Sequence, residues 1–463
     1  MIPLNKPHII IILIDVGRAD YFSCYGFPLK TTPYIDRFAK EAVLFENVLS
    51  TAPWTVPSHG SLFTGLYPFQ HQATWKTLRL KNGIPTIFDI FIKEGYKATA
   101  ISANTLLVSP YNMFGNKTTL IIPDKNPDAR FSIFLNKFDY KKTDSKSILD
   151  CFIRYLEQTN WNEPQIVYIN FYDLHSKYKP RQPYYSRFIN KRLDRILNKI
   201  GDLYELLFKE INEEIEITDE IIEAIRAFYI AKLAMIDEDI GIILKRLKEK
   251  RILDNAILVI TSDHGDILGD HKRPSFHHQF SIYNSLLKIP LIFYYPKIKP
   301  KRIKTSLIQN IDILPTILEI CSMSKDLRNC PGVSLTDYIC NNNTTQPRQY
   351  AFSFYDSPQR FFLRHKRKAN PLFLKDLFAV QDENYKLIIS DRDDVELYNI
   401  KEDKNETRNI AEKYPKKVKE LREALMDIIN GYKYLKAKTK TEALALEKNK
   451  RLIQKLKSLG YIV

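Results

Sequence analysis

Residues 8–15 read HIIIILID, a continuous run of mostly β-branched apolar side chains that ends in an acid. Such a run predicts a strand buried on both faces, as in a parallel sheet. Asp15 stands at the carboxyl end of this strand, which is where ligand sites of open α/β sheets lie. A carboxylate after so apolar a run is costly unless something pairs with it. The stretch therefore predicts a parallel α/β sheet and places Asp15 in a candidate ligand site.

Three further apolar runs also end in polar side chains. ATAISAN ends at Asn104, QIVYINFYDLH runs into His175, and AILVITS is followed by Asp263 and His264. Helical patterns separate these runs, and strands that alternate with helices predict a mainly parallel sheet flanked by helices. An Asn at a strand end is more often a turn residue than a ligand contact.

The length and patterning of the chain predict two domains. Its 463 residues exceed what one core usually spans, and we expect the α/β domain to cover residues 1–335. Within it, residues 228–250 form the clearest amphipathic helix, and we expect its charges to lie on a solvated face. From about residue 340, short strand-like segments are followed by a Lys-rich tail. We therefore expect residues 340–463 to form a small α+β domain with a basic helical tail.

The composition favours an anionic substrate. The chain has 70 Lys and Arg against 54 Asp and Glu, a net charge of +16. Much of the excess is scattered or lies in the tail, so nucleic-acid binding is not expected. The five cysteines include no C-x-x-C pair, which is compatible with the reducing interior of a cell. No apolar run reaches the length of a membrane span. We expect a cytoplasmic protein, and the sequence gives no indication of oligomeric state.

Residues 51–65, TAPWTVPSHGSLFTG, contain the candidate nucleophile. Pro53 and Pro57 restrict the backbone on both sides of Thr55, which predicts a rigid turn that presents the Thr55 hydroxyl rather than burying it. The run from Ser58 onward reads as a helix start, whose free N–H groups favour an anion. A hydroxyl beside such an end suits attack on a sulfate or phosphate ester. The competing interpretation is a proline-braced helix cap.

The polar strand ends should meet, because a parallel sheet gathers the carboxyl ends of its strands at one edge. Two Asp, one His and one hydroxyl form a set of oxygen and nitrogen donors suited to a divalent cation. The residues expected to gather are Asp15, Thr55, Asn104, His175, Asp263 and His264.

Stretches spread from residue 8 to about residue 411 resemble, in order, those of sulfatases, which belong to the alkaline phosphatase superfamily. The resemblance implies the alkaline-phosphatase-like α/β fold predicted above. The stretches are IDVGRADYFSCYG, TTPYIDRFAKEAVLFENV, STAPWTVPSHGSLFTGLYP, GYKATAISAN, IDEDIGIILKRLKEKRILDNAILVITSDHGDILGDH, HHQFSIYNSLLKIPLIFYYP, NIDILPTILEI and ELYNIKEDKNETRNIA.

The resemblance implies a metal site. Asp15, Asp263 and His264 match metal-binding positions of the family, whereas Val16 stands where many members have a second Asp. It implies one divalent cation, calcium, manganese or zinc, and leaves a second ion open. The oxygen lost at Val16 shifts the expected preference from calcium toward manganese or zinc.

Thr55 falls where sulfatases carry the Cys or Ser of C/S-x-P-S-R that becomes formylglycine. This chain reads Thr-Val-Pro-Ser-His from Thr55 to His59, so both the nucleophile and the Arg differ. A Thr cannot be oxidised to formylglycine, and we expect none. Phosphoryl-transferring relatives in the superfamily use a metal-bound Thr at this place, which implies a covalent Thr55 intermediate.

Further site residues follow from the resemblance. His175 and His278 match positions that would contact the ester oxygens, and one of them would protonate the leaving group. Asn104 and His59 are expected substrate contacts, His59 in place of the missing Arg. His271 is a further candidate contact or ligand.

These residues predict a metal-dependent, sulfatase-like hydrolase that cleaves a sulfate or phosphate ester of a small anionic substrate through Thr55. The alternatives are a phosphodiesterase, phosphonate hydrolase or phospho-group transferase of the same superfamily, and a non-catalytic binding protein. The intact set of Asp15, Thr55, Asp263 and His264 argues against the last.

Overall fold

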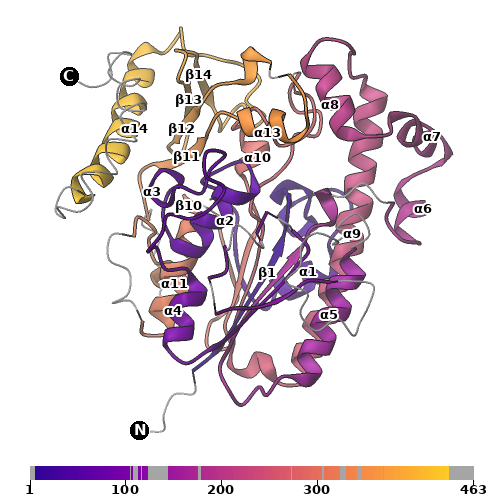
Figure 1. Cartoon of the computed structure of the whole chain (residues 1–463), viewed down its shortest axis with the longest axis vertical. Helices are drawn as coiled ribbons and strands as arrows, with labels where there is room; N and C mark the ends of the chain where they lie inside the picture. The colour runs from indigo at the N-terminus through magenta and orange to yellow at the C-terminus, as the bar shows by residue number, and fades with distance from the viewer. Residues whose placement is uncertain are drawn as a thin grey trace.

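A central sheet of eight strands runs through the chain, in the order β5-β4-β6-β1-β7-β8-β2-β9 (Figure 1). The computed structural model describes residues 6–104, 106–107, 113–115, 117–123, 144–175, 179–272, 274–304, 307–323, 330–340, 347–368 and 370–436. The sheet is formed by β1 (His8–Ile14), β2 (Val43–Phe45), β4 (Lys97–Ser102), β5 (Thr119–Ile121), β6 (Gln165–Phe171), β7 (Ala256–Thr261), β8 (Leu291–Tyr294) and β9 (Lys301–Ile303).

The sheet is mainly parallel, which confirms the predicted fold class. β1 pairs in parallel with both β6 and β7, and β4 pairs in parallel with β5 and β6. Only β8 breaks the pattern within the described sheet, since it runs antiparallel to β7 and β2. Every residue of β1, β6 and β7 is buried, because helices cover both faces.

Helices lie on both sides of this sheet (Figure 1). The long helix α9 (Asp219–Glu249) packs with α1 (Pro33–Ala39), α5 (Ser145–Gln158), α6 (Tyr184–Phe188) and α7 (Lys191–Ile200). A second group is formed by α2 (Thr55–Thr64), α3 (Pro68–His71), α4 (Ile87–Lys93) and α11 (Ile313–Ile320).

Shorter elements complete the described chain. These are the strand pair β3 (Val48–Leu49) and β10 (Ile308–Gln309), the helices α8 (Leu203–Ile211), α10 (Asn284–Leu287), α12 (Thr336–Cys340) and α13 (Gln359–Arg364), and the 3-10 helices η1 (Ala19–Tyr21), η2 (Ser23–Tyr25), η5 (Asp173–His175), η6 (Ile252–Asn255), η7 (Asn310–Asp312) and η9 (Pro371–Phe373).

The prediction that the charges of α9 lie on a solvated face is wrong for three residues. Lys232, Asp237 and Asp239 are buried. The Asp237 carboxylate accepts hydrogen bonds from the backbone N–H groups of Tyr34, at 3.0 Å, and Ile35, at 2.8 Å. These N–H groups belong to the first turn of α1, which has no intrahelical acceptor for them. The carboxylate therefore serves as a cap for a neighbouring helix, a role that spacing along α9 could not reveal.

A four-stranded antiparallel sheet forms the C-terminal part, as the predicted α+β domain requires. It contains β11 (Ala351–Tyr355), β12 (Leu377–Gln381), β13 (Tyr385–Ser390) and β14 (Val395–Asn399), and α14 (Pro415–Lys436) packs on β12 and β13. The sequence did not predict β12. The domain boundary near residue 340 stays a prediction, and the tail from residue 437 onward lies outside the described residues.

None of the described helices is both long and apolar enough to cross a bilayer. All five cysteines are free, so no disulfide framework holds the fold.

A fully buried ion pair in the C-terminal part is also hydrogen-bonded to the residues at the start of α10. The Lys386 Nζ atom lies 2.7 Å from a Glu406 carboxylate oxygen, and the two side chains are 0% and 1% exposed. Lys386 also donates to the Ile282 carbonyl at 2.7 Å and to Asn284 Oδ1 at 3.0 Å. Removing one partner would leave the other charge buried and unpaired.

We expect Lys386→Met and Glu406→Gln each to lower the free energy of unfolding by about 3–5 kcal/mol in urea titrations. The double variant should lose less than the sum of the two, because it leaves no uncompensated charge. Lys419→Met, in an exposed pair with Glu423, is the matched control and should change stability by at most about 1 kcal/mol. Equal small losses for all three variants would contradict a structural role for the buried pair.

Candidate active site

The carboxyl ends of β1 and β7 meet the first turn of α2. Asp15 follows β1, Asp263 and His264 follow β7, and Thr55 is the first residue of α2. Because β1 and β7 are adjacent and parallel, Asp15 and Asp263 leave the sheet side by side. The structure thus brings together four residues that are up to 249 positions apart in the chain (264 − 15).

The imidazole of His264 lies at the centre of this group. Its Nε2 atom is 3.3 Å from Asp263 Oδ2, 3.9 Å from Asp15 Oδ1 and 3.5 Å from Thr55 Oγ1. Its Nδ1 atom donates to the Gly265 carbonyl at 2.8 Å. In the neutral ring Nε2 therefore carries the lone pair, which lies beside the two carboxylates and the hydroxyl.

Each carboxylate has one oxygen fixed by hydrogen bonds and one left over. Asp15 Oδ2 accepts from Asn104 Nδ2 at 2.8 Å, and Asp263 Oδ1 accepts from the backbone N–H groups of Val16, at 3.2 Å, and His264, at 2.9 Å. Asp15 Oδ1 and Asp263 Oδ2 are buried, and neither has a hydrogen-bond partner among the described residues. Two orphaned anionic oxygens beside an imidazole lone pair fit a divalent cation.

Burial dominates the titration of these groups. It raises the pKa of Asp15 well above its ordinary value, with a further contribution from the neighbouring Asp263 charge. It raises the pKa of Asp263 to about 7 and lowers the pKa of His264. Two carboxylates placed together away from water resist joint ionisation, so a positive charge between them would stabilise both in their ionised form.

Thr55 is buried at the start of α2, whereas the sequence predicted an exposed hydroxyl on a turn before the helix. The predicted helix start at Ser58 is three residues late, because α2 begins at Thr55, and the Thr55 side chain is only 2% exposed rather than presented to solvent. The whole of α2 is buried, and Trp54 stacks on Trp75 beside its N-terminus, with ring centroids 4.0 Å apart. The N-cap residue, Trp54, makes no side-chain cap bond to this end of the helix in the described structure, and free N–H groups there would favour an anion.

Ser58 fixes α2 against the loop that carries Asp263. Its hydroxyl donates to the Asp263 carbonyl at 2.6 Å and accepts from Ser50 Oγ at 2.9 Å and from Asn310 Nδ2 at 3.0 Å. Neither Ser58 nor Asn310 carried a sequence signal for this role, because the partners lie in distant segments. The bonds set the position of Thr55 relative to the carboxylates.

His59 uses both of its ring nitrogens within the protein. Nδ1 donates to the Thr55 carbonyl at 2.8 Å, and Nε2 accepts from the Tyr168 hydroxyl at 2.7 Å. The ring is fully buried, which lowers the pKa of His59 to about 3 and keeps it neutral. A contact of His59 with substrate would therefore require one of these bonds to break.

Asn104 contacts Asp15 in this structure, and both polar ends of its side chain make hydrogen bonds. Besides the bond from Nδ2 to Asp15, its Oδ1 atom accepts from the backbone N–H of Leu106 at 3.0 Å. Asn104 therefore orients a carboxylate of the site.

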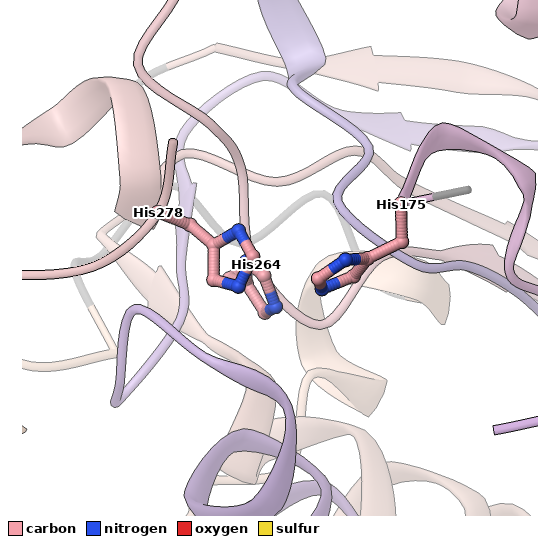
Figure 2. Close-up of side chains that lie close together, drawn as sticks. All are labelled: His175, His264 and His278. Atoms are coloured by element: carbon pink, nitrogen blue, oxygen red, sulfur yellow. The ribbon is translucent and has the colours of Figure 1, made fainter. Parts of the chain in front are cut away.

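A second wall is formed by His175 on η5 and His278 on the segment before α10 (Figure 2). The His175 and His278 ring centroids are 4.4 Å apart, and those of His264 and His278 are 4.7 Å apart. His277 stacks on His278 at 4.2 Å. Burial lowers the pKa of His278 well below its ordinary value.

His271 is not brought into either group. Its ring stacks on Tyr283 with centroids 3.7 Å apart, and burial lowers the pKa of His271 to about 4. Among the described residues, the clusters able to hold a metal are Asp15–Asp263–His264 and His175–His264–His278, and His271 belongs to neither.

The loop after β1 is held in an unfavourable conformation by a hydroxyl from α9. Val16 has φ +65°, which a β-branched residue rarely adopts and which an Asp tolerates better. The Tyr229 hydroxyl donates to the Val16 carbonyl at 2.8 Å and accepts from the Arg18 backbone N–H at 2.9 Å. Sequence reasoning missed Tyr229, since its only signal was one more aromatic residue on a helix.

We expect Tyr229→Phe to lower the free energy of unfolding by about 1–3 kcal/mol, because two buried backbone groups lose their partner. Tyr21→Phe is the matched control: the Tyr21 ring lies 5.1 Å from Tyr229. No described residue hydrogen-bonds the Tyr21 hydroxyl, so its loss should change stability by at most about 0.5 kcal/mol. Urea titration of both variants measures the difference, and equal stability would contradict the role given to the Tyr229 hydroxyl.

Comparison with known proteins identifies the family to which the chain belongs. The mainly parallel sheet and the carboxylate–imidazole cluster at its strand ends define an α/β enzyme with the alkaline-phosphatase-like fold. The sulfatase family profile matches residues 7–323, and the profile described as N-sulphoglucosamine sulphohydrolase, C-terminal, matches residues 269–431. The chain belongs to the sulfatase family, a family of sulfuric ester hydrolases.

The relatives align over nearly the whole chain. An N-acetylglucosamine-6-O-sulfatase of Bacteroides thetaiotaomicron is 24% identical over 499 aligned positions, which cover 93% of this chain and 87% of that protein. An arylsulfatase of Clostridium perfringens is 24% identical, with 92% of this chain and 95% of that protein covered.

Solved structures share the fold. A 2-O GAG sulfatase superposes with a TM-score of 0.72 at 21% identity, covering 92% of this chain and 93% of that one. The phosphonate monoester hydrolase of Agrobacterium radiobacter superposes with a TM-score of 0.70 at 18% identity, covering 92% and 96%.

Proposed function

We propose that this chain is a metal-dependent hydrolase that cleaves a sulfate or phosphate ester through a covalent Thr55 intermediate. The observation that carries the proposal is the pair of orphaned buried oxygens, Asp15 Oδ1 and Asp263 Oδ2, gathered with His264 Nε2 beside the Thr55 hydroxyl. A helix cap would need none of these neighbours. The sulfatase family relation supports the same chemistry.

Asp15, Asp263 and His264 would hold one divalent cation, with the Thr55 oxygen beside them. When bound, the cation would lower the pKa of the Thr55 hydroxyl and neutralise charge on the ester oxygens. Val16 supplies no oxygen where many family members have an Asp, and we propose manganese or zinc in preference to calcium.

Thr55 acts as the nucleophile in this proposal. Its hydroxyl loses a proton to solvent, and the oxygen attacks sulfur or phosphorus, so that the bond to Thr55 forms as the bond to the leaving oxygen breaks. The leaving oxygen takes the bonding electron pair and receives a proton from an imidazole. Water then attacks the Thr55 ester, gives a proton to the same imidazole and releases sulfate or phosphate with the Thr55 oxygen restored.

His175 is the better candidate for the proton donor. His278 is buried, and its lowered pKa keeps the ring neutral near pH 7, so it is suited to donating a hydrogen bond to an ester oxygen. His175 is half-buried, and its side chain lies opposite His278 (Figure 2), where a leaving group could meet solvent. His59 and Asn104 position Thr55 and Asp15.

A phosphate or phosphonate ester is the second candidate substrate. Thr55 cannot become formylglycine, and a direct Thr nucleophile is used by phosphoryl-transferring relatives of this superfamily. Phosphonate monoester hydrolases share the fold. The relative that is an N-acetylglucosamine-6-O-sulfatase makes sulfated sugars the first sulfate esters to test. We propose a small anionic ester as substrate and a cytoplasmic location.

Thr55→Val should lower turnover by several orders of magnitude and leave the fold intact. The change keeps the β-branched shape but removes the attacking oxygen and one donor of the cation site. Turnover on paired nitrophenyl sulfate and phosphate esters, with melting temperature measured on the same sample, tests this and also shows which ester is preferred.

Thr64→Val is the matched control, at the other end of the same helix. The Thr64 hydroxyl is buried and donates to the Gly60 carbonyl at 2.6 Å, so its loss should cost about 1 kcal/mol of stability and spare turnover. A fully active Thr55→Val protein would show that Thr55 only starts the helix.

Cation affinity should rise with pH through the range around pH 7. The raised pKa of Asp263, about 7, and that of Asp15 mean that the cation-free carboxyls hold protons that a cation must displace. Affinity should therefore rise by about tenfold per pH unit for each proton released. The cation-free protein, whose folded-state pKa values are raised, should lose stability as pH rises through the same range.

Isothermal titration with manganese at about pH 6 and about pH 8 measures this effect, in two buffers of different ionisation enthalpy that reveal the protons released. Affinity that is independent of pH would contradict a cation site built on these two carboxylates.

A further inference from the structure

Helices α8 and α13 lie beside one another (Figure 1) and contact each other through aromatic side chains. Tyr204 and Phe208 are four positions apart on α8, so they share one face of that helix. Phe361 lies on α13, and His365, four positions later, follows the last residue of α13. The ring centroids of Tyr204 and His365 are 4.5 Å apart, and those of Phe208 and Phe361 are 5.8 Å apart. Facing aromatic stripes therefore join the two helices.

These rings continue outward from His278. The His277 ring stacks on His278 with centroids 4.2 Å apart, and it lies 5.0 Å from the Tyr204 ring. The Phe361 ring lies 6.2 Å from His277 and 4.7 Å from His365. We call the four rings of His277, Tyr204, Phe361 and His365 the aromatic wall. It connects the Thr55 site to helices α8 and α13.

The aromatic wall becomes more exposed with distance from His278. His278 is 4% exposed and His277 is 8% exposed, whereas Tyr204 and His365 are half-buried. Solvent therefore reaches the outer end of the wall. A substrate whose ester group lies beside Thr55 and whose other end extends toward solvent would lie along these rings.

His277, at the inner end of the wall, is strained and incompletely paired. Its backbone has φ +79°, a conformation that a non-glycine residue keeps only where the surrounding structure imposes it. Its Nδ1 atom is buried and has no hydrogen-bond partner among the described residues. Strained residues and buried polar atoms without partners both call for an explanation beyond packing, and a bound ligand supplies one.

We propose that the aromatic wall binds the alcohol part of the substrate and that this part is a ring with an apolar face. Aromatic side chains hold a ring through offset-stacked and edge-to-face contacts, which an acyclic chain makes less well. Aryl rings and sugar rings both present such a face. Tyr204 and His365, at the outer end, select a ring over a chain. This assignment rests on the proposed function, because the Thr55 site must hold the ester group.

Inert analogues that differ only in the group beyond the anion test the wall without turnover. Benzylphosphonate carries an aryl ring, cyclohexylmethylphosphonate carries a saturated ring in place of a sugar ring, and heptylphosphonate carries a chain with the same number of carbon atoms. Their dissociation constants for the manganese-loaded protein are measured by isothermal titration calorimetry, and those of the corresponding sulfonates are measured in parallel. We expect at least one ring analogue to bind about tenfold more tightly than the chain.

Variants of the outer rings locate this preference. Tyr204→Ala and His365→Ala should each weaken binding of the preferred ring analogue by about fivefold to tenfold and binding of the chain by less than about twofold. Tyr204→Phe and His365→Phe keep a ring and should preserve the preference. Leu363→Ala is the matched control, because this side chain on α13 is 68% exposed, and it should leave all affinities unchanged. Thermal melts confirm that each variant is folded.

Equal affinity of ring and chain analogues for the wild-type protein would overturn the proposal. A ring preference that survives both alanine changes would also overturn it. The proposed function has a separate test in the turnover of Thr55→Val. Ring binding that depends on Tyr204 and His365, in a protein whose Thr55→Val variant stays fully active, would contradict the proposed function alone.

Discussion

Two carboxylates buried at adjacent strand ends impose the main constraint on this structure. Asp15 and Asp263 are 0% and 1% exposed, and each keeps one oxygen without a hydrogen bond to any described residue. Ionising both in a dry interior is costly, as the raised pKa of each shows, unless a positive charge lies between them. Buried carboxylates with strongly raised pKa values cluster at functional sites, which supports the cation site that we propose.

The surrounding residues hold the carboxylates in place through long-range hydrogen bonds. Asn104 fixes one oxygen of Asp15, the Val16 backbone fixes one of Asp263, and Tyr229 secures the Val16 loop from α9. Ser58 ties α2, the helix that begins at Thr55, to the Asp263 carbonyl. These bonds join the loops that follow the strands to one another and to helices α2 and α9, so the position of Thr55 depends on the packing of the whole domain.

Local sequence patterns predicted the parts of the fold that local physics determines. Continuous apolar runs identified β1, β6 and β7, and their polar ends identified Asp15, His175, Asp263 and His264. Patterns could not predict that Asp237 would cap α1 or that Tyr229 would support Val16, because both depend on helix α9 packing against distant segments. The burial of Thr55 was missed for the same reason: prolines restrict a turn, but neighbouring elements decide what covers it.

The most direct test of the central claim is to identify the group that forms the covalent intermediate. Manganese-loaded protein is mixed with excess nitrophenyl ester, quenched in acid during turnover, digested and analysed by mass spectrometry. We expect one sulfo or phospho group on the peptide that contains Thr55, localised to Thr55 and absent from the Thr55→Val protein. An unmodified Thr55 during rapid turnover, or a group carried by His175 or His278, would contradict it.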